Sequence, residues 1–170
     1  MKVTLLMALT LDGRIGKDAE HLADWSEKAD KKLFMEKTKE SGVLIMGSKT
    51  YDTIGRPLPE RKNIILTRSP QTRESSEDLI FTNNTPEKIL EDLALQGFKE
   101  VILAGGRSVN TLFAREGLID EIMVTISPLV FGHGLGLFED DIAMKLELIE
   151  SKALGEHSLV AHYRVLPDRD

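Results

Sequence analysis

The stretch that decides the fold covers residues 45–66 and reads IMGSKTYDTIGRPLPERKNIIL. Its first residues belong to an apolar run, 43–46, that predicts a short buried strand. A short helix is expected over 47–54. The two prolines and the glycine of 55–59 predict a loop, because they continue neither a helix nor a strand. A second strand is expected over 63–66, and strand, helix and strand in this order are typical of a parallel α/β sheet.

The same alternation extends over the rest of the chain. A helix is expected over 26–40, with Ser26 as its N-cap and Gly42 just beyond its end. The pair Thr85-Pro86 predicts the start of another helix, which Gly97 ends. Further elements are expected as strands at 2–10, 79–82, 99–103 and 121–126, a helix at 107–115, a long polar loop at 11–25, and an antiparallel hairpin at 145–152 and 158–165. The fold class is therefore α/β, a mostly parallel twisted sheet flanked by helices with a C-terminal antiparallel hairpin.

Length and composition fit one globular domain that spans 1–170. The chain has 170 residues, of which 41% are hydrophobic, and a formal net charge of −6. It has no cysteine, which excludes a disulfide framework, a thiolate nucleophile and a cysteine-based zinc site. The four histidines show no metal-ligand spacing, so no metal is expected.

Two apolar stretches resemble membrane signals without their defining features. Lys2 and the apolar run 3–11 look like the start of a signal peptide, but no small-residue cleavage site follows before Asp12. The uncharged run 122–138 is interrupted by Pro128 and three glycines, and it is short for a spanning helix, which needs about 20 residues. We therefore expect a cytoplasmic protein without a membrane span, in which this run forms a buried strand that continues into a glycine-rich loop.

The charge is unevenly distributed. The net negative charge argues against a nucleic-acid-binding protein, because nothing supplies the broad basic face that phosphate neutralisation requires. Residues 47–73 nevertheless contain six basic and two acidic residues, so this segment carries +4 and the remaining chain −10. A basic segment in an acidic protein indicates a small anionic ligand.

One carboxylate stands out on the helix expected over 26–40. Asp30 shares a helix face with Phe34 and Thr38, at the i+4 and i+8 positions. A carboxylate on an apolar face is unfavourable unless a cation or a hydrogen-bond donor meets it, which makes Asp30 a candidate functional residue. The alternative is a solvated helix residue, since charged residues surround Asp30 in the sequence.

Three further features have both a functional and a structural interpretation. Gly105-Gly106 lies between an expected strand and helix, where glycines let a phosphate approach the N–H groups at a helix N-terminus; a ligand-free tight turn also uses them. Arg61 suits a bidentate contact with a carboxylate, or it is a surface arginine. Trp25, the only tryptophan, lines a site or anchors packing.

Together these residues resemble the dihydrofolate reductase family over nearly the whole chain. Residues 45–66 are similar to that family's run M-G-R-x-T-[WY]-x-S-I-G-x-P-L-P-x-R-x-N-I-I-[LV]. Supporting matches are Ala8, Ile15-Gly16, Trp25 five residues before Asp30, the Asp30/Phe34/Thr38 spacing, Gly105-Gly106 and Thr125. The resemblance implies NADPH-dependent reduction of 7,8-dihydrofolate to tetrahydrofolate in one-carbon metabolism, by hydride transfer to C6 and protonation of N5.

The resemblance also implies the site residues. Asp30 is expected to bind the 2-amino and N3 side of the pterin with support from Thr125, and these two with Trp25 form the expected catalytic group. Arg61 is expected to bind the glutamate α-carboxylate of folate. The other substrate-binding residues are expected to be Met7, Ala8, Phe34, Ile54 and Leu58. The NADPH site is expected to comprise Ala8, Ile15, Gly16, Gly47, Ser48, Lys49, Thr50, Leu66, Thr67, Arg68, Ala104, Gly105, Gly106, Arg107, Ser108 and Val109.

Ser48 departs from the family pattern, because many members have a phosphate-binding arginine at this position. The resemblance assigns the 2′-phosphate of NADPH to Lys49 and Arg68, and Arg68 or Arg107 is expected to replace the missing arginine. The Gly105-Gly106 pair is expected to approach the pyrophosphate through a cis peptide.

A second family is also similar. Residues 11–15 (LDGRI) and 127–138 (SPLVFGHGLGLF) resemble the related pyrimidine reductase domain of riboflavin biosynthesis, which shares the fold and NADPH but reduces a ribosylaminopyrimidine phosphate. Its members do not usually carry G-R-P-L-P-x-R. A non-catalytic nucleotide-binding protein of the same fold is the third interpretation. The expected partner is a small molecule, with no nucleic acid and no membrane, and the expected assembly is a monomer or a homodimer.

Overall fold

The computed structural model describes residues 1–18, 21 and 24–167. In this part of the chain the helices are α1 (Lys28–Ser41), α2 (Ser48–Ile54), α3 (Pro86–Leu95) and α4 (Arg107–Arg115), with a 3-10 turn η1 (Pro70–Thr72). The strands are β1 (Lys2–Thr10), β2 (Val43–Gly47), β3 (Lys62–Leu66), β4 (Leu79–Thr82), β5 (Glu100–Leu103), β6 (Glu121–Ser127), β7 (Lys145–Leu154) and β8 (Ser158–Leu166).

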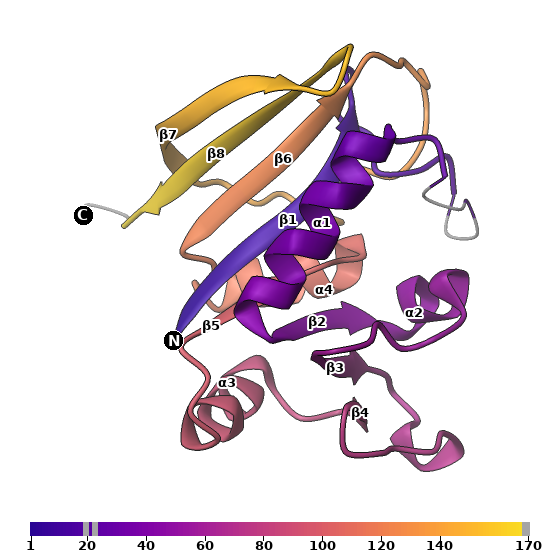
Figure 1. Cartoon of the computed structure of the whole chain (residues 1–170). Coiled ribbons are helices and arrows are strands. Elements are labelled where there is room, and N and C mark those ends of the chain that lie inside the picture. The colour runs from indigo at the N-terminus through magenta and orange to yellow at the C-terminus, as the bar shows by residue number, and fades with distance from the viewer. Residues whose placement is uncertain (19–20, 22–23, 168–170) are drawn as a thin grey trace.

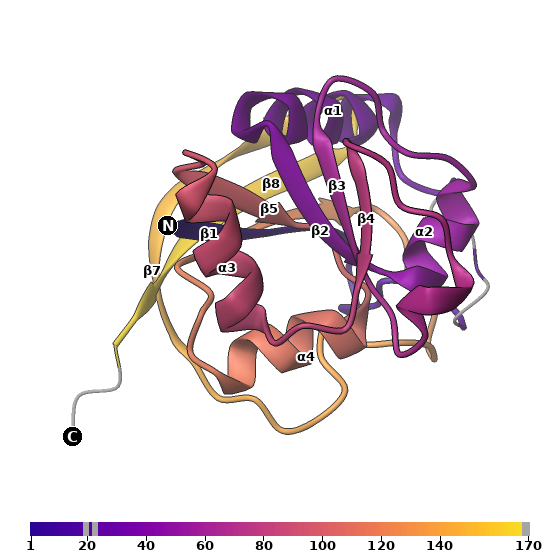
Figure 2. The same cartoon turned by 90° about the horizontal axis from the view of Figure 1, so that it is seen from below.

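One sheet contains all eight of these strands, in the order β4-β3-β2-β5-β1-β6-β8-β7. The first six pair in parallel, whereas β8 runs antiparallel to β6 and β7 antiparallel to β8. Helix α1 covers one face of the sheet, and α3 and α4 cover the other (Figures 1 and 2). Parallel strands buried on both faces read as continuous apolar runs, which is the pattern of β2.

The core forms one layer on each side of the sheet. On the α1 side, Leu44 and Met46 of β2 pack with Met123 and with Phe34 of α1. On the opposite side, the fully buried Phe113 of α4 is part of the layer formed with α3 and the other strand faces. Alternation along each strand sends successive side chains to the two layers, so both faces of the parallel strands are closed to water.

The expected elements are present, and one predicted cap is wrong. Ser26 is buried and does not cap α1; Glu27 is the N-cap residue, and the helix begins at Lys28. The reason lies in the tertiary structure, because the Glu27 carboxylate accepts a hydrogen bond of 2.6 Å from Oγ of Ser158, the first residue of β8. In the expected loop 11–25, positions 19, 20, 22 and 23 lie outside the described residues.

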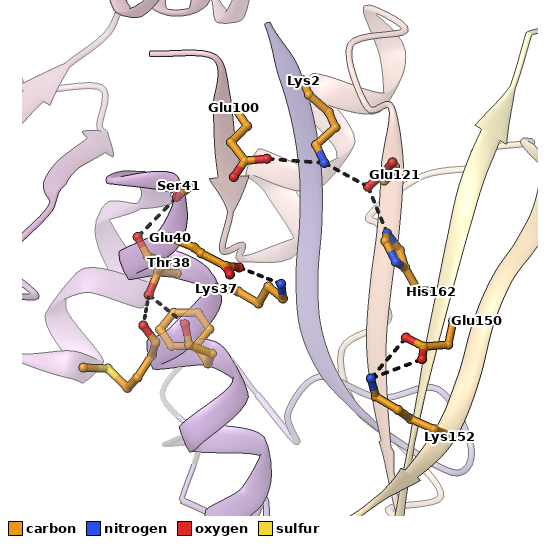
Figure 3. Close-up of polar contacts among 12 residues, drawn as sticks. Lys2, Lys37, Thr38, Glu40, Ser41, Glu100, Glu121, Glu150, Lys152 and His162 are labelled. Carbon is orange, nitrogen blue, oxygen red and sulfur yellow. Dashed lines mark hydrogen bonds and ion pairs between the residues drawn. The ribbon is translucent and has the colours of Figure 1, made fainter. Parts of the chain in front are cut away.

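An ionic cluster ties four neighbouring strands, β5, β1, β6 and β8, together near the amino end of β1 (Figure 3). Lys2 Nζ lies 3.3 Å from Glu100 and 3.5 Å from Glu121, and Glu121 lies 2.9 Å from His162 Nε2. Burial alone raises the pKa of Glu121, but the hydrogen bond with His162 and the charge of Lys2 outweigh burial, so the pKa lies below its ordinary value. No helix of the described part of the chain is long and apolar enough to cross a membrane.

Candidate active site

A cavity of about 1040 Å³ opens at the carboxyl ends of the parallel strands. This is the edge at which open α/β sheets usually bind ligands. Its lining includes most of the residues expected from the sequence: Met7, Ala8, Ile15, Trp25, Asp30, Phe34, Gly47, Ser48, Lys49, Thr50, Ile54, Leu58, Leu66, Thr67, Arg68, Ala104, Gly106, Arg107, Ser108 and Val109. The predicted substrate and cofactor residues therefore share one cavity.

Asp30 supplies a buried carboxylate at one end of this cavity. It lies in the first turn of α1 and is 9% exposed. Its neighbours in the lining include the apolar side chains of Leu6, Met7 and Phe34. Its burial shows that the alternative of a solvated helix residue is wrong. No other described residue forms a side-chain hydrogen bond or ion pair with it. A buried carboxylate of this kind needs a donor, and the cavity is where a ligand could supply one.

Arg61 lies behind the cavity lining. It is 3% exposed, and its guanidinium is held by Pro59 O at 2.8 Å from Nε and by Thr38 Oγ1 and Met35 O at Nη1. The remaining nitrogen, Nη2, is buried without an acceptor among the described residues. Burial lowers the pKa of Arg61, while the charge of Glu60 opposes this shift, and an arginine stays protonated under such conditions. The surface alternative for Arg61 is therefore wrong.

Three other expected residues also lie outside the lining. Thr125 is fully buried in β6 opposite Ala8 of β1, and its Oγ1 has no partner in the described structure. Gly16 is buried and forms a backbone bridge with Leu135. Gly105 packs so closely on Met7 that a Cβ atom there would lie 2.8 Å from Met7 Sδ. These residues shape the lining from behind.

Two glycine positions bring β2 and β5 together under the cavity. The Gly105-Gly106 peptide is cis, as the resemblance implied, and Gly105 has φ +85°, which suits glycine. The N–H of Gly47 donates to Gly105 O at 2.8 Å, and a Cβ on Gly47 would lie 3.1 Å from Val109 Cγ2. Because α4 begins at Arg107 and Gly106 is its N-cap, the N-terminus of this helix belongs to the cavity wall.

The basic residues expected at the cofactor end of the cavity differ in their partners. Lys49 and Arg68 line the cavity and form no ion pair with another described residue, so their charge is available to an anionic ligand. Arg107 instead lies 3.4 Å from the Glu139 carboxylate, which also accepts a hydrogen bond from Ser108 Oγ. Arg107 is therefore less suited than Arg68 to replace the arginine missing at Ser48.

Sequence reasoning missed several lining residues. Leu135 and Glu139 come from the glycine-rich segment after β6, and their contacts with Gly16 and Ser108 join positions far apart in the sequence. The similarity of residues 127–138 to a pyrimidine reductase was the sequence signal from which a contribution of this segment to the cavity lining could have been predicted. The other missed residues are Leu6, Asp18, His21, Ser26, Lys31, Met35, Thr53, Thr82, Asn83, Asn84 and Leu112.

Comparison with known proteins confirms the resemblance drawn from residues 45–66. The family model described as dihydrofolate reductase matches residues 2–127. The chain belongs to the dihydrofolate reductase family. Among its relatives, the dihydrofolate reductase of Haemophilus influenzae is 36% identical over 106 residues, which are 62% of this chain and 61% of that protein.

The solved structures that share the fold include a pyrimidine reductase-like protein and a dihydrofolate reductase. A pyrimidine reductase-like protein from Corynebacterium diphtheriae superposes with a TM-score of 0.80 at 16% identity, covering 98% of this chain and 92% of that one. Dihydrofolate reductase from Enterococcus faecalis, complexed with NADP(H) and RAB-propyl, superposes with a TM-score of 0.73 at 22% identity, and the match covers 96% of both chains. At these identities the likeness concerns the fold alone, and it confirms the expected α/β class with its antiparallel C-terminal strands.

Proposed function

We propose that the chain reduces 7,8-dihydrofolate to tetrahydrofolate with NADPH, acting as one domain over residues 1–170. The observation that carries the proposal is a pair of polar groups along α1 that the described residues leave available to a ligand. Asp30 is a largely buried carboxylate to which no described residue donates, and Arg61, bound to Thr38 eight residues further on, has a buried nitrogen without an acceptor. Eight helical residues span about 12 Å at 1.5 Å per residue. The pair suits an elongated ligand with N–H donors at one end and a carboxylate at the other.

Asp30 would bind the pterin end of this ligand. A carboxylate can accept hydrogen bonds from two parallel N–H groups, such as those of the 2-amino and N3 side of a pterin. Its negative charge in an apolar environment would favour protonation of N5 while C6 is reduced. In this proposal Trp25 forms part of the surrounding wall, and Thr125 supports the same end from beneath Ala8.

Arg61 would bind the glutamate end. Its contacts with Pro59, Met35 and Thr38 fix the guanidinium plane, so the free Nη2 needs no further ordering to donate to a carboxylate. Leu58 and Met35 line the cavity and Arg61 does not, so a small shift of apolar lining side chains such as Met35, which Arg61 Nη1 contacts, would admit the ligand. An arginine held in this way would orient the bound substrate and would contribute little to the rate of the chemical step.

The other end of the cavity fits a dinucleotide phosphate ligand. The glycine junction beneath the α4 N-terminus leaves room for close approach of a pyrophosphate, and the available charges of Lys49 and Arg68 suit a 2′-phosphate. NADPH, when bound, supplies the hydride. The residues of this chain would bind and orient it through Thr50, Thr67 and the backbone at Gly106.

One observation favours a second candidate function, reduction of a ribosylaminopyrimidine phosphate. The family model ends at residue 127, whereas the cavity wall continues into the segment that contains Leu135 and Glu139. That segment resembles the pyrimidine reductases of riboflavin biosynthesis. Steady-state NADPH oxidation by the purified protein tests both candidates. Turnover with dihydrofolate supports the proposal, turnover with the pyrimidine alone replaces it, and turnover with neither favours a binding protein.

A further inference from the structure

We propose that Asp12 is a positioning residue that shapes the cavity wall beside Trp25, by fixing Phe131 in the segment after β6. Neither residue lines the cavity, and neither has a role in the proposed reaction. The inference concerns how the wall is built and is independent of which substrate the cavity takes.

The Asp12 carboxylate is bound at both oxygens. Oδ1 accepts from Thr10 Oγ1 at 2.6 Å and from the N–H of Phe131 at 3.1 Å, and Oδ2 accepts from the N–H of Gly132 at 2.8 Å. Arg14 Nε lies 4.0 Å from Oδ2. The hydrogen bond from Thr10, followed by those from the two N–H groups, lowers the pKa of Asp12 to about 2. A carboxylate accepting several such bonds stays ionised at neutral pH.

Backbone pairing aligns the two segments that Asp12 joins. Leu11 N donates to Leu129 O at 2.8 Å, Ile15 N to Leu135 O at 2.9 Å, and Leu135 N to Gly16 O at 2.8 Å. Between these pairs, residues 130–134 leave the ladder, and the Asp12 carboxylate satisfies two N–H groups there. Asp12 therefore sets the course of the chain at Phe131, where backbone pairing does not.

The Phe131 ring connects Asp12 to the cavity wall through contacts with two lining residues, Trp25 and His21. Its centroid lies 5.5 Å from that of Trp25, edge-on at 75°, and 5.5 Å from that of His21. Lys17 Nζ lies 5.3 Å from the same ring. Trp25 and His21 both line the cavity. Aromatic contacts of this geometry stabilise a fixed arrangement, so the chain of contacts from Asp12 through Phe131 determines where these rings lie.

The only tryptophan of the chain provides a direct readout. We expect Asp12→Ala to shift the Trp25 fluorescence emission to longer wavelength, because the Phe131 ring no longer shields the indole. Phe131→Ala should give the same shift, and the double variant no more than either single one, as expected for residues that act through one contact. The matched control is Asp120→Ala, since Asp120 also accepts a backbone N–H, that of Val3 at 2.7 Å, at the far end of β1. It should leave the emission unchanged.

A second pair of variants covers the case in which Asp12→Ala does not fold. Thr10→Val removes the hydroxyl that orients the carboxylate and should give a smaller red shift, whereas Thr10→Ser should behave as wild type. Far-ultraviolet circular dichroism establishes which variants are folded. Unchanged Trp25 emission in folded Asp12→Ala, or in folded Thr10→Val if the first variant fails to fold, overturns the proposal. Additive shifts in the double variant would also overturn it.

Discussion

Arg61 donates a hydrogen bond to Thr38 Oγ1, and this contact joins the loop before β3 to the last turn of α1. The Thr38 hydroxyl also donates to Phe34 O at 2.7 Å. Because Phe34 lines the cavity and Asp30 lies one turn before it, the guanidinium and the carboxylate are held on one rigid element. Their spacing is therefore fixed by the helix, which is what a site for an elongated two-ended ligand requires.

Replacing the guanidinium should affect both stability and substrate binding. In Arg61→Met, the acceptors at Thr38, Met35 and Pro59 lose their donor, and we expect the free energy of unfolding to fall by about 1–3 kcal/mol. The KM for dihydrofolate should rise about tenfold or more with little change in kcat, because the lost contact binds ground state and transition state alike. Urea unfolding and steady-state kinetics measure the two effects. Arg56→Met, at an exposed position on the same loop, is the control, and an unchanged KM in Arg61→Met would refute the role of Arg61.

Neutralising Asp30 should separate function from stability. We expect Asp30→Asn to lower kcat by about 10²-fold or more, with the greatest loss at high pH, where protonation of N5 is scarce. The thermal midpoint should stay the same or rise, since a buried carboxylate without a partner is unfavourable for folding. Glu36→Gln, on the exposed side of the same helix, should change neither quantity. Full activity of Asp30→Asn across the pH range would show that the Asp30 carboxylate does not promote protonation of N5.

The available cations should discriminate between the two nicotinamide cofactors. Arg68→Gln is expected to weaken NADPH binding about tenfold, by loss of one charge-assisted contact, and to leave NADH binding nearly unchanged. Equilibrium titration of each cofactor measures this. Arg73→Gln serves as the control, because Arg73 belongs to the same basic segment but is engaged by Asp52 at 2.7 Å. Equal losses for both cofactors would place Arg68 away from the 2′-phosphate.

The ionic cluster near the amino end of β1 should support stability in a defined pH range. The pKa of Glu121 lies below its ordinary value in the folded protein, so its contribution is complete above the unfolded-state pKa and is lost as the pH falls through the lower, folded-state value. Glu121→Gln should therefore destabilise the protein at neutral pH and much less in acid. Denaturant unfolding at neutral pH and at an acidic pH below the folded-state pKa of Glu121 tests this. Glu156→Gln, in the exposed Glu156–His157 pair, is the control. Equal destabilisation at both values would contradict it.

Local sequence predicted the elements well where local chemistry decides them. The apolar run of β2, the prolines after α2 and the Thr85-Pro86 start of α3 each act within a few residues, and the structure has those elements at the expected places. The N-cap of α1 was wrong because Glu27 is selected by Ser158, a contact across 131 positions. No local pattern contains that information.

In the candidate site, too, some placements follow from local sequence and others depend on contacts between residues far apart in the chain. Residues near the carboxyl ends of strands, such as Lys49 and Arg68, could be predicted to share a cavity, because parallel strands bring those ends together. The burial of Arg61 depends on how the loop before β3 folds onto Thr38, and the wall around Leu135 depends on pairing with Gly16. These placements arise from tertiary packing and required the structure.

The most direct test of the central claim is the ratio of kcat/KM for dihydrofolate to kcat/KM for the ribosylaminopyrimidine phosphate, measured by NADPH oxidation in wild type and in Arg61→Met. The account predicts that the wild type prefers dihydrofolate and that the substitution reduces this preference. A wild-type preference for the pyrimidine, unaffected by the loss of Arg61, would contradict it.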